Sequence, residues 1–187
     1  MIGREEAFKI LAELITDQLV VTGIASQTTF WYQAKHRPEN LYLRGPMGQA
    51  PAIGLGVAMA HPQRRVVVIE GDGSMLMGLT SLIAVAHLQP KNYTIICVDN
   101  GLYEGGGQGK TIAAGKIDFV KTVQGMGIAM AESVTDPGEF KNSAAKHLNA
   151  GHCGFLHAVI APRKEKLQAP MLKPYEMKHQ FLSALQS

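Results

Sequence analysis

One stretch of the chain, residues 66–107, constrains the fold more than any other. It opens with a run of apolar, mostly β-branched residues over 66–69, which is typical of a parallel strand buried on both faces. The glycine-framed acid Gly71-Asp72-Gly73-Ser74 follows, and the apolar spacing beyond it predicts a helix over 75–88. A second apolar run over 93–98 predicts another strand. The stretch therefore predicts a strand-helix-strand unit.

Two polar residues, Asp72 and Asn100, follow the ends of the two predicted strands. Because a crossover between neighbouring parallel strands returns the chain in the same direction, both residues should emerge at one carboxyl edge, where open α/β sheets bind ligands. The start of the intervening helix suits a phosphate, which a carboxylate would repel unless a divalent cation lay between them. Carboxylate, amide and carbonyl oxygens are ligands that Mg²⁺ prefers. The spacing therefore predicts a metal-bridged diphosphate site.

The same residues resemble the motif of thiamine-diphosphate enzymes, in which Gly-Asp-Gly and a downstream Asn hold Mg²⁺ and diphosphate. Here the Asn stands 28 residues after the Asp, and the segment from Gly45 to Ala50 is similar to the family's segment under the aminopyrimidine ring. With the glycine-rich loop 101–111 and the carboxyl-terminal residues 176–185, the resemblance to sulfopyruvate and phosphonopyruvate decarboxylases spans nearly all 187 residues. It implies an α/β fold, a doubly wound parallel sheet with helices on both faces, of the diphosphate-binding (PP) type.

The resemblance also implies roles for individual residues. Asp72, Asn100 and the Leu102 carbonyl would be the metal ligands, while Gly73 and Ser74 would contact the diphosphate. Met47 would hold the cofactor bent, and the Gly45 carbonyl would face its amino group. The cofactor-binding residues implied in this way are Gly45, Met47, Asp72, Gly73, Ser74, Asn100, Leu102 and Tyr103.

The sequence does not identify a catalytic residue. Thiamine enzymes need a Glu beside the pyrimidine, which the family places on a separate domain, whereas this chain has the length of one domain, 1–187. A second subunit with the pyrimidine-binding domain is therefore expected to supply that Glu in a larger hetero-oligomer. Loop 101–111 is expected to order over the cofactor as a lid. Glu104 within it is a candidate acid/base group, although a loop carboxylate is more often simply solvated.

The expected activity is release of CO₂ from a small 2-oxo acid to give an aldehyde. This chain has Ser26-Gln27 where the decarboxylases often have Ser followed by Arg or Lys, which removes a positive charge that could face an anionic substrate. Two alternatives stay open. One is a carboligase of the acetolactate synthase type, and the other is a non-catalytic subunit that binds a nucleotide or cofactor and regulates a partner.

Composition and charge argue against several other classes of protein. The net charge of +3 comes from scattered Lys and Arg residues, and the nearest approach to a cluster, 163–166, lacks interleaved aromatic residues, so it indicates a solvated linker rather than nucleic-acid binding. No apolar run approaches the roughly 20 residues of a membrane span. Two cysteines, Cys97 and Cys153, indicate no disulfide framework. A cytoplasmic protein without nucleic-acid or membrane partners is expected.

Helix and strand signals alternate through the rest of the chain. The predicted helices cover 4–16, 28–35, 51–60, 117–125, 137–148 and 175–185, and the predicted strands cover 19–21, 128–130 and 155–160. Asp136 is the expected N-cap of the helix that begins at Pro137. The aromatic cluster at 30–32 is expected to pack against a neighbour rather than to form a stacking platform.

Overall fold

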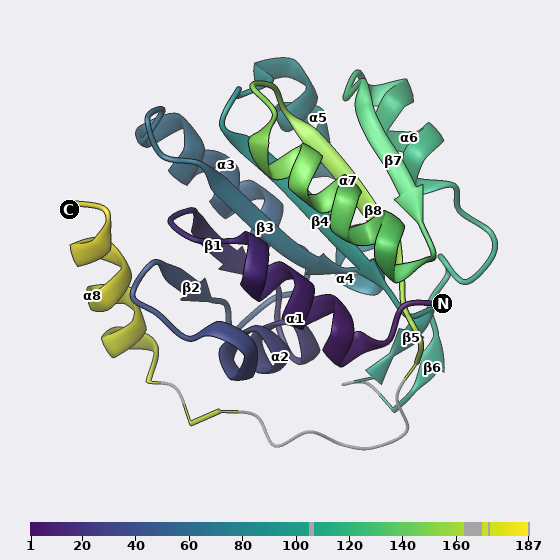
Figure 1. Cartoon of the computed structure of the whole chain (residues 1–187), viewed down its shortest axis with the longest axis horizontal. Coiled ribbons are helices and arrows are strands. Elements are labelled where there is room, and N and C mark those ends of the chain that lie inside the picture. The colour runs from purple at the N-terminus through teal and green to yellow at the C-terminus, as the bar shows by residue number, and fades with distance from the viewer. Residues whose placement is uncertain (105–106, 163–169, 172, 187) are drawn as a thin grey trace.

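A computed structural model of the chain describes residues 1–104, 107–162, 170–171 and 173–186, so the predicted linker at 163–166 lies outside the described residues. Its centre is a six-stranded, all-parallel sheet with the strand order β2-β1-β3-β4-β8-β7 (Figure 1). The strands are β1 (Leu19–Thr22), β2 (Asn40–Tyr42), β3 (Val66–Gly71), β4 (Tyr93–Asp99), β7 (Met130–Val134) and β8 (Gly154–Val159). A separate two-stranded ribbon pairs β5 (Leu102–Tyr103) with β6 (Gly109–Lys110).

Helices cover both faces of the sheet, which confirms the predicted doubly wound architecture (Figure 1). One face packs against α1 (Arg4–Leu14), α2 (Ser26–Lys35) and α7 (Pro137–Asn149). The other face packs against α3 (Ala50–Ala60), α4 (Asp72–Met77), α5 (Leu79–Leu88) and α6 (Phe119–Met126). The last helix, α8 (Pro174–Ala184), lies at the β2 edge of the sheet. Among the described residues, the helices are too short or too polar to span a membrane.

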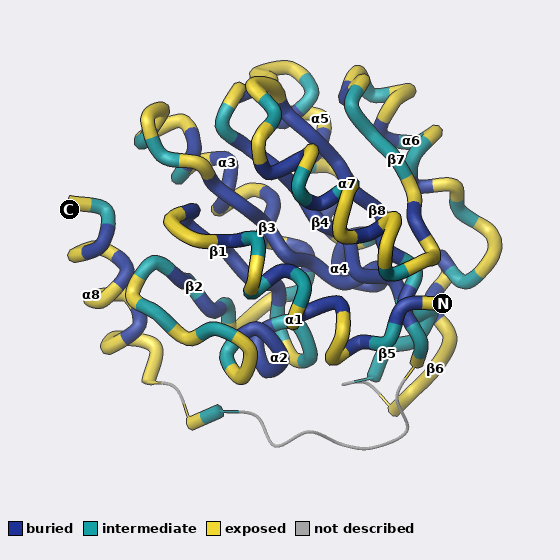
Figure 2. The backbone as a smooth tube through the Cα atoms, in the orientation of Figure 1, coloured by how far each residue is buried: buried dark blue, intermediate teal, exposed yellow. Residues whose placement is uncertain are grey.

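The two central strands are buried along their whole length (Figure 2). Side chains alternate between the two faces, so Val67 and Ile69 join the core under α1 and α7, while Val66 and Val68 join the core under α3 and α5. This two-sided burial explains why the strand sequence is a continuous apolar run. The aromatic cluster also packs as expected, since Trp31 is fully buried and Phe30 stacks on Phe8 with ring centroids 5.4 Å apart.

Two predicted elements were wrong in detail. The single helix expected over 75–88 is two helices, α4 and α5, which are divided at Gly78. A Cβ atom at Gly78 would lie 2.4 Å from the carbonyl oxygen of Gly48, so the division follows from a close backbone contact with a segment far away in the sequence. The strand expected over 128–130 instead begins at Met130 as β7, because Gly127 ends α6 with a φ of +112° and Ile128 turns into the core.

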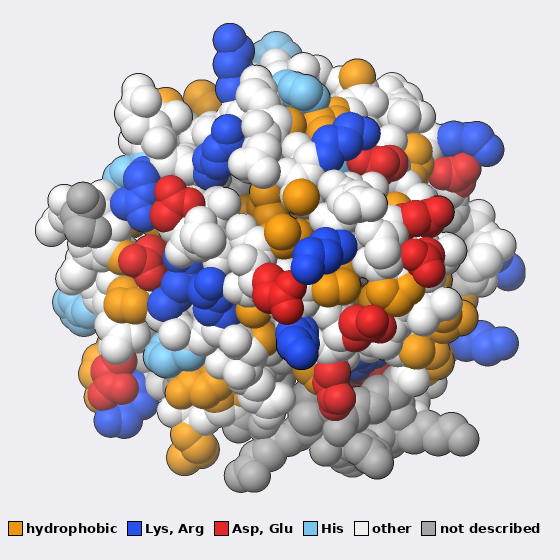
Figure 3. All heavy atoms as spheres, viewed as in Figure 1, with side chains coloured by type: hydrophobic (Ala, Val, Ile, Leu, Met, Phe, Trp, Pro, Cys, Tyr) orange, Lys and Arg blue, Asp and Glu red, His pale blue; other side chains and the backbone are white. Residues whose placement is uncertain are grey.

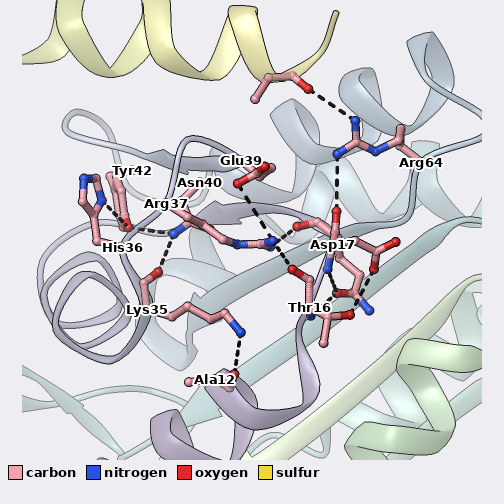
Figure 4. A network of polar contacts seen from close by, with 12 residues as sticks. Ala12, Thr16, Asp17, Lys35, His36, Arg37, Glu39, Asn40, Tyr42 and Arg64 are labelled. Carbon is pink, nitrogen blue, oxygen red and sulfur yellow. Dashed lines mark hydrogen bonds and ion pairs between the residues drawn. The ribbon is translucent and has the colours of Figure 1, made fainter. Parts of the chain in front are cut away.

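A polar network ties β2 and the end of α2 to the turn before β1 (Figure 4). Arg37 donates to the carbonyl of Thr16 over 2.6 Å and to the carbonyl of Gln18. Lys35 Nζ donates to the carbonyl of Ala12 over 2.8 Å, and Asn40 Nδ2 donates to the carbonyl of Lys35 over 2.6 Å. Side chains thus satisfy carbonyl groups at the end of α1 and in the following turn, which fixes where β1 enters the sheet.

The buried histidine of α7 makes stability depend on pH. His147 is fully buried, with Nε2 2.9 Å from Glu132 Oε1, and burial lowers its pKa from the ordinary 6.5 against the opposing effect of Glu132; Lys146 and His152 lower it further. Below pH 6.5 the unfolded chain therefore takes up a proton that the folded chain resists, so the free energy of unfolding should fall as the pH drops.

Urea unfolding at pH 7.5 and pH 5.5 measures this effect. His147→Gln should show a smaller loss of stability between the two pH values than the wild type, while His87→Gln, at an exposed position of α5, should keep the wild-type loss. Equal losses in wild type and His147→Gln would contradict the assignment.

Candidate active site

A cleft of about 600 Å³ opens at the carboxyl edge of the sheet, where β1, β3 and β4 end. The start of α4 and the β5–β6 ribbon both lie at this edge (Figure 1). The residues that line the cleft are Ile24, Ala25, Ser26, Gln27, Met47, Gly71, Asp72, Gly73, Ser74, Met77, Asn100, Leu102, Tyr103, Glu104 and Gly109. Seven of the eight residues proposed from the sequence to bind the cofactor are therefore in one cavity; Gly45 is exposed and is not among the lining residues.

The three residues expected to bind the metal all line the cleft near the ends of β3 and β4. Asp72 follows β3 directly, is 2% exposed, and accepts a 2.5 Å hydrogen bond at Oδ2 from the Thr111 hydroxyl. Asn100 follows β4, and its Oδ1 accepts a 2.9 Å hydrogen bond from the Leu102 N–H. This turn folds the start of the loop back over the strand end and brings Leu102 onto the cleft wall.

A second carboxylate, Asp99, lies beside Asp72. Burial and the charge of Asp99 raise the pKa of Asp72 against the hydrogen bond from Thr111. Burial also acts to raise the pKa of Asp99. Its contacts with His157 Nε2 at 2.9 Å and with the Gly101 N–H at 2.8 Å outweigh burial, so the pKa of Asp99 is lowered. A bound divalent cation would relieve the repulsion between these two buried carboxylates.

The donors at this point suit a hard cation held by mixed oxygen ligands. Within the described residues, no group of three or more His, Cys, Asp or Glu side chains could hold a metal ion. The predicted ligands are one carboxylate oxygen from Asp72, an amide oxygen from Asn100 and a backbone carbonyl, which is the donor chemistry that Mg²⁺ accepts while keeping water or phosphate oxygens as its other ligands. The residues present thus fit Mg²⁺.

The first turn of α4 lies on the cleft wall, and at Gly73 a side chain of the loop covers its backbone. A Cβ atom at Gly73 would lie 2.3 Å from Cε1 of Tyr103, so the tyrosine ring packs directly against the bare backbone at this position. Ser74 follows on the cleft wall and is 5% exposed. Backbone N–H groups at a helix start, with a serine hydroxyl beside them, can bind phosphate oxygens. The diphosphate-binding role of Gly73 and Ser74 stays a prediction.

The cleft wall that contains Met47 depends on a contact between two glycines. Gly48 has a φ of +79°, and a Cβ atom on it would lie 2.5 Å from the N atom of Gly78. Because the two backbones touch, Met47 is held in the cleft between the start of α3 and the end of α4. An apolar side chain at this place is what a supporting contact for a cofactor ring would need. The role of Met47 stays a prediction.

Glu104 lines the cleft, and its carboxylate is bound by two other side chains. Its two carboxylate oxygens form a bidentate ion pair with Arg4 of α1, at 2.6 Å for the bond from Nη2, and Oε2 also accepts a 2.7 Å hydrogen bond from the Ser26 hydroxyl. The Arg4 and Glu104 side chains are only 6% and 14% exposed. Glu104 therefore connects the start of the loop to α1 and α2, and its acid/base role stays a prediction.

Breaking this ion pair should loosen the loop. Because both side chains are mostly buried, Arg4→Met should lower the free energy of unfolding by about 3 kcal/mol, as expected when a buried pair loses one partner. It should also speed trypsin cleavage at the exposed Lys110. The double variant Arg4→Met/Glu104→Gln removes both charges and should lose less stability than the sum of the two single variants. Strictly additive losses in urea unfolding would contradict this prediction.

Sequence reasoning also missed the buried acid Glu70. It is 1% exposed, its Oε1 accepts a 3.0 Å hydrogen bond from the Gly71 N–H, and Oε2 has no hydrogen-bond partner. Burial raises its pKa to about 7 against hydrogen bonds from Gly71, Ser74 and Ala50. A Cβ atom at Gly23 would lie 1.8 Å from Glu70 Oε1, so the carboxyl group packs between the ends of β1 and β3. Its position in an otherwise apolar strand was the available signal.

The family follows from comparison with known proteins. Residues 22–158 match the thiamine pyrophosphate enzyme family, C-terminal TPP binding domain. The chain belongs to this family, which confirms the predicted fold and the thiamine diphosphate cofactor. The match includes Asp72, Asn100 and every strand from β3 to β7.

Two individual relatives are similar to most of this chain. The chain is 33% identical over 180 residues to the sulfopyruvate decarboxylase subunit β of Methanocaldococcus jannaschii. This match covers 95% of this chain and 93% of that protein. It is 31% identical over 174 residues to the phosphonopyruvate decarboxylase of Streptomyces viridochromogenes, where the match covers 92% of this chain but only 43% of the longer protein.

A solved structure supports the fold. A protein from Mycobacterium smegmatis, assigned to the thiamin diphosphate-dependent enzymes, superimposes with a TM-score of 0.74 over 87% of this chain and 32% of its own length. Its sequence identity to this chain is 17%, so the likeness concerns the fold alone.

Proposed function

We propose that this chain is the thiamine diphosphate- and Mg²⁺-binding subunit of a 2-oxo acid decarboxylase that releases CO₂ and forms an aldehyde. One observation carries the proposal: Asp72, Asn100 and Leu102 meet in a single cleft beside the start of α4, in a chain that is similar along its length to a decarboxylase β subunit. A cytoplasmic location and a single domain over 1–187 stay predictions from the sequence.

The chain's residues have separate tasks in this proposal. Asp72, the Asn100 side-chain oxygen and the Leu102 carbonyl would hold Mg²⁺, and Gly73 and Ser74 would bind the diphosphate. Thr111 would orient Asp72 and the Leu102 N–H would orient Asn100, as outer partners of metal ligands do. When bound, thiamine diphosphate supplies the electron sink that makes loss of CO₂ from a 2-oxo acid possible.

The rest of the cleft would hold the cofactor ring and the substrate. Met47 and Tyr103 line the cleft near the α4 start, and both would limit access of water to the reacting atoms. The role of the Gly45 carbonyl stays a prediction from the sequence. Ser26 and Gln27, at the start of α2, are placed where a small 2-oxo acid could contact them.

A partner subunit is part of the proposal. Among the carboxylates that line the cleft, Asp72 is assigned to the metal and Glu104 is paired with Arg4, so neither is available to activate the cofactor. The activating Glu is proposed to come from a second chain with a pyrimidine-binding domain. In the longer phosphonopyruvate decarboxylase relative, more than half of the protein lies outside the match to this chain, which leaves room for such a domain.

The test is CO₂ release by this chain co-purified with that partner, in the presence of thiamine diphosphate and Mg²⁺. A panel of 2-oxo acids that includes sulfopyruvate and phosphonopyruvate should contain at least one substrate, and the chain alone should show no turnover. Cofactor binding with carbon-carbon ligation but no aldehyde would favour the carboligase alternative. Binding of nucleotides without thiamine diphosphate would favour the regulatory alternative and overturn the proposal.

A further inference from the structure

A buried histidine, His157 of β8, connects three neighbouring strands close to the cleft. Its Nε2 lies 2.9 Å from Oδ2 of Asp99, at the end of β4, and its Nδ1 lies 2.8 Å from the Ser133 hydroxyl of β7. The strand register places His157 between Cys97 of β4 and Ser133 of β7, so the contacts follow from the parallel pairing. We call Ser133, His157 and Asp99 the His157 network.

The chemistry of the three groups gives both hydrogen bonds a direction. An ionised carboxylate only accepts, so Nε2 of His157 carries the proton and donates to Asp99. In the neutral ring, Nδ1 then accepts from the Ser133 hydroxyl. Ser-His-Asp is also the order of a hydrolase triad, but the described residues that line the cleft include neither Ser133 nor His157. The His157 network therefore orients a carboxylate rather than activating a nucleophile.

Asp99 in turn holds the start of the loop. Because Oδ2 of Asp99 is bound to His157, Oδ1 is directed at the Gly101 N–H, which donates to it over 2.8 Å. The Gly101 carbonyl accepts a 2.9 Å hydrogen bond from the Thr111 N–H, and the Thr111 hydroxyl donates to Asp72. The two ends of the loop are thus bonded to each other and to two neighbouring carboxylates, of which one is bound by His157.

We propose that His157 is a positioning residue for the metal site, which acts through Asp99 on the turn that leads to the Leu102 carbonyl. The proposal rests on the proposed function, because it takes that carbonyl as a metal ligand. The side chains of His157 and Asp99 are only 11% and 12% exposed, and the His157 ring packs against Phe119 with ring centroids 5.2 Å apart. Water is therefore a poor substitute for the ring, and without it the Asp99 carboxylate can rotate away from the Gly101 N–H.

The test separates the hydrogen bond from the packing of the ring. His157→Leu removes the donor, and the affinity for Mg²⁺ in saturating thiamine diphosphate, measured by isothermal titration, should fall about 10- to 100-fold. His157→Gln keeps an N–H donor and should retain most of the wild-type affinity. In EDTA without cofactor, the Gly101 amide should exchange its hydrogen about 10-fold faster in His157→Leu than in the wild type, as measured by NMR.

The matched control is His147→Leu. His147 is also buried and binds a carboxylate, with Nε2 2.9 Å from Glu132 Oε1, but it lies at the opposite end of β8 from the cleft, where a Cβ atom at Gly154 would be 2.5 Å from its Nδ1. Figure 3 views the molecule from the side of its helix α7, where Lys, Arg, Asp and Glu side chains of both signs are spread over the surface. His147→Leu should lower stability as His157→Leu does, but should keep the wild-type Mg²⁺ affinity and Gly101 exchange.

The outcomes separate this role of His157 from the proposed function. If His157→Leu binds Mg²⁺ as tightly as the wild type, the positioning role is wrong even when the assembled enzyme releases CO₂. If His157→Gln loses as much affinity as His157→Leu, the ring acts by packing and the role is again wrong. If the wild type binds no Mg²⁺ with thiamine diphosphate, the proposed function fails. Faster Gly101 exchange in His157→Leu would then still support the action of His157 on the turn, and unchanged exchange would overturn it.

Discussion

Replacing Asp72 with asparagine should abolish Mg²⁺-dependent binding of thiamine diphosphate and, with it, CO₂ release by the assembled enzyme. The change keeps the size of the side chain but removes the charge that faces the proposed cation, and the loss in cofactor affinity should exceed about 100-fold. The isolated chain should not be destabilised, because Asp72 is buried beside Asp99 and its charge is unfavourable without a cation. Isothermal titration with thiamine diphosphate in excess Mg²⁺ measures the affinity.

The matched control is Asp118→Asn. Asp118 is an exposed N-cap residue of α6 that accepts a 2.9 Å hydrogen bond from the Lys121 N–H, so the same chemical change occurs far from the cleft. It should change stability by less than about 0.5 kcal/mol, because asparagine caps a helix about as well as aspartate does, and it should leave cofactor affinity unchanged. If Asp72→Asn bound thiamine diphosphate as tightly as Asp118→Asn, the carboxylate would not be a metal ligand.

The substitution Gly78→Val should disrupt the wall of the cleft. A Cβ atom at Gly78 would lie 2.4 Å from the Gly48 carbonyl oxygen, which is backbone and cannot rotate away, so the segment with Met47 must shift. The φ of Gly78 is −92°, which valine can adopt, and the effect is therefore steric rather than conformational. The free energy of unfolding should fall by about 2–4 kcal/mol, and cofactor affinity should fall with it.

Gly56→Ala provides the comparison for this variant. Gly56 lies inside α3, and a Cβ atom there would meet no neighbour within 4 Å. Alanine should stabilise the isolated chain by up to about 1 kcal/mol, since glycine is a poor helix former. Urea unfolding of the two variants should therefore give changes of opposite sign. A neutral Gly78→Val would show that the two glycines do not need to touch.

Helices and strands whose composition reflects their surroundings could be predicted from the sequence. The strands β3 and β4 are buried on both faces, and their continuous apolar runs are found without knowledge of the fold. The edge strand β7 has only Val134 buried, so its short mixed sequence gave a weak signal, and the predicted strand began too early. The division between α4 and α5 depends on Gly48, 30 residues before Gly78, and local periodicity cannot report such a contact.

For the candidate site too, residues in local motifs were predicted, whereas contacts between distant segments were not. Asp72, Asn100 and Met47 lie in segments that have a recognisable local pattern, and the structure places all three in one cleft. The long-range contacts of the cleft residues were not predicted. Thr111 reaches Asp72 from the far end of the loop, and Arg4 pairs with Glu104 across 100 positions of sequence, so both contacts exist only in the folded chain.

The central claim is that this cleft binds thiamine diphosphate through Mg²⁺, and thermal unfolding of the purified chain tests it most directly. With Mg²⁺, saturating thiamine diphosphate should raise the unfolding midpoint by roughly 5–10 °C, which corresponds to about 2.7 kcal/mol at 100 times the dissociation constant. In EDTA the same concentration should produce almost no shift, because the diphosphate would face Asp72 without a cation between them. Equal shifts with and without Mg²⁺, or a shift with ADP but none with thiamine diphosphate, would contradict the claim.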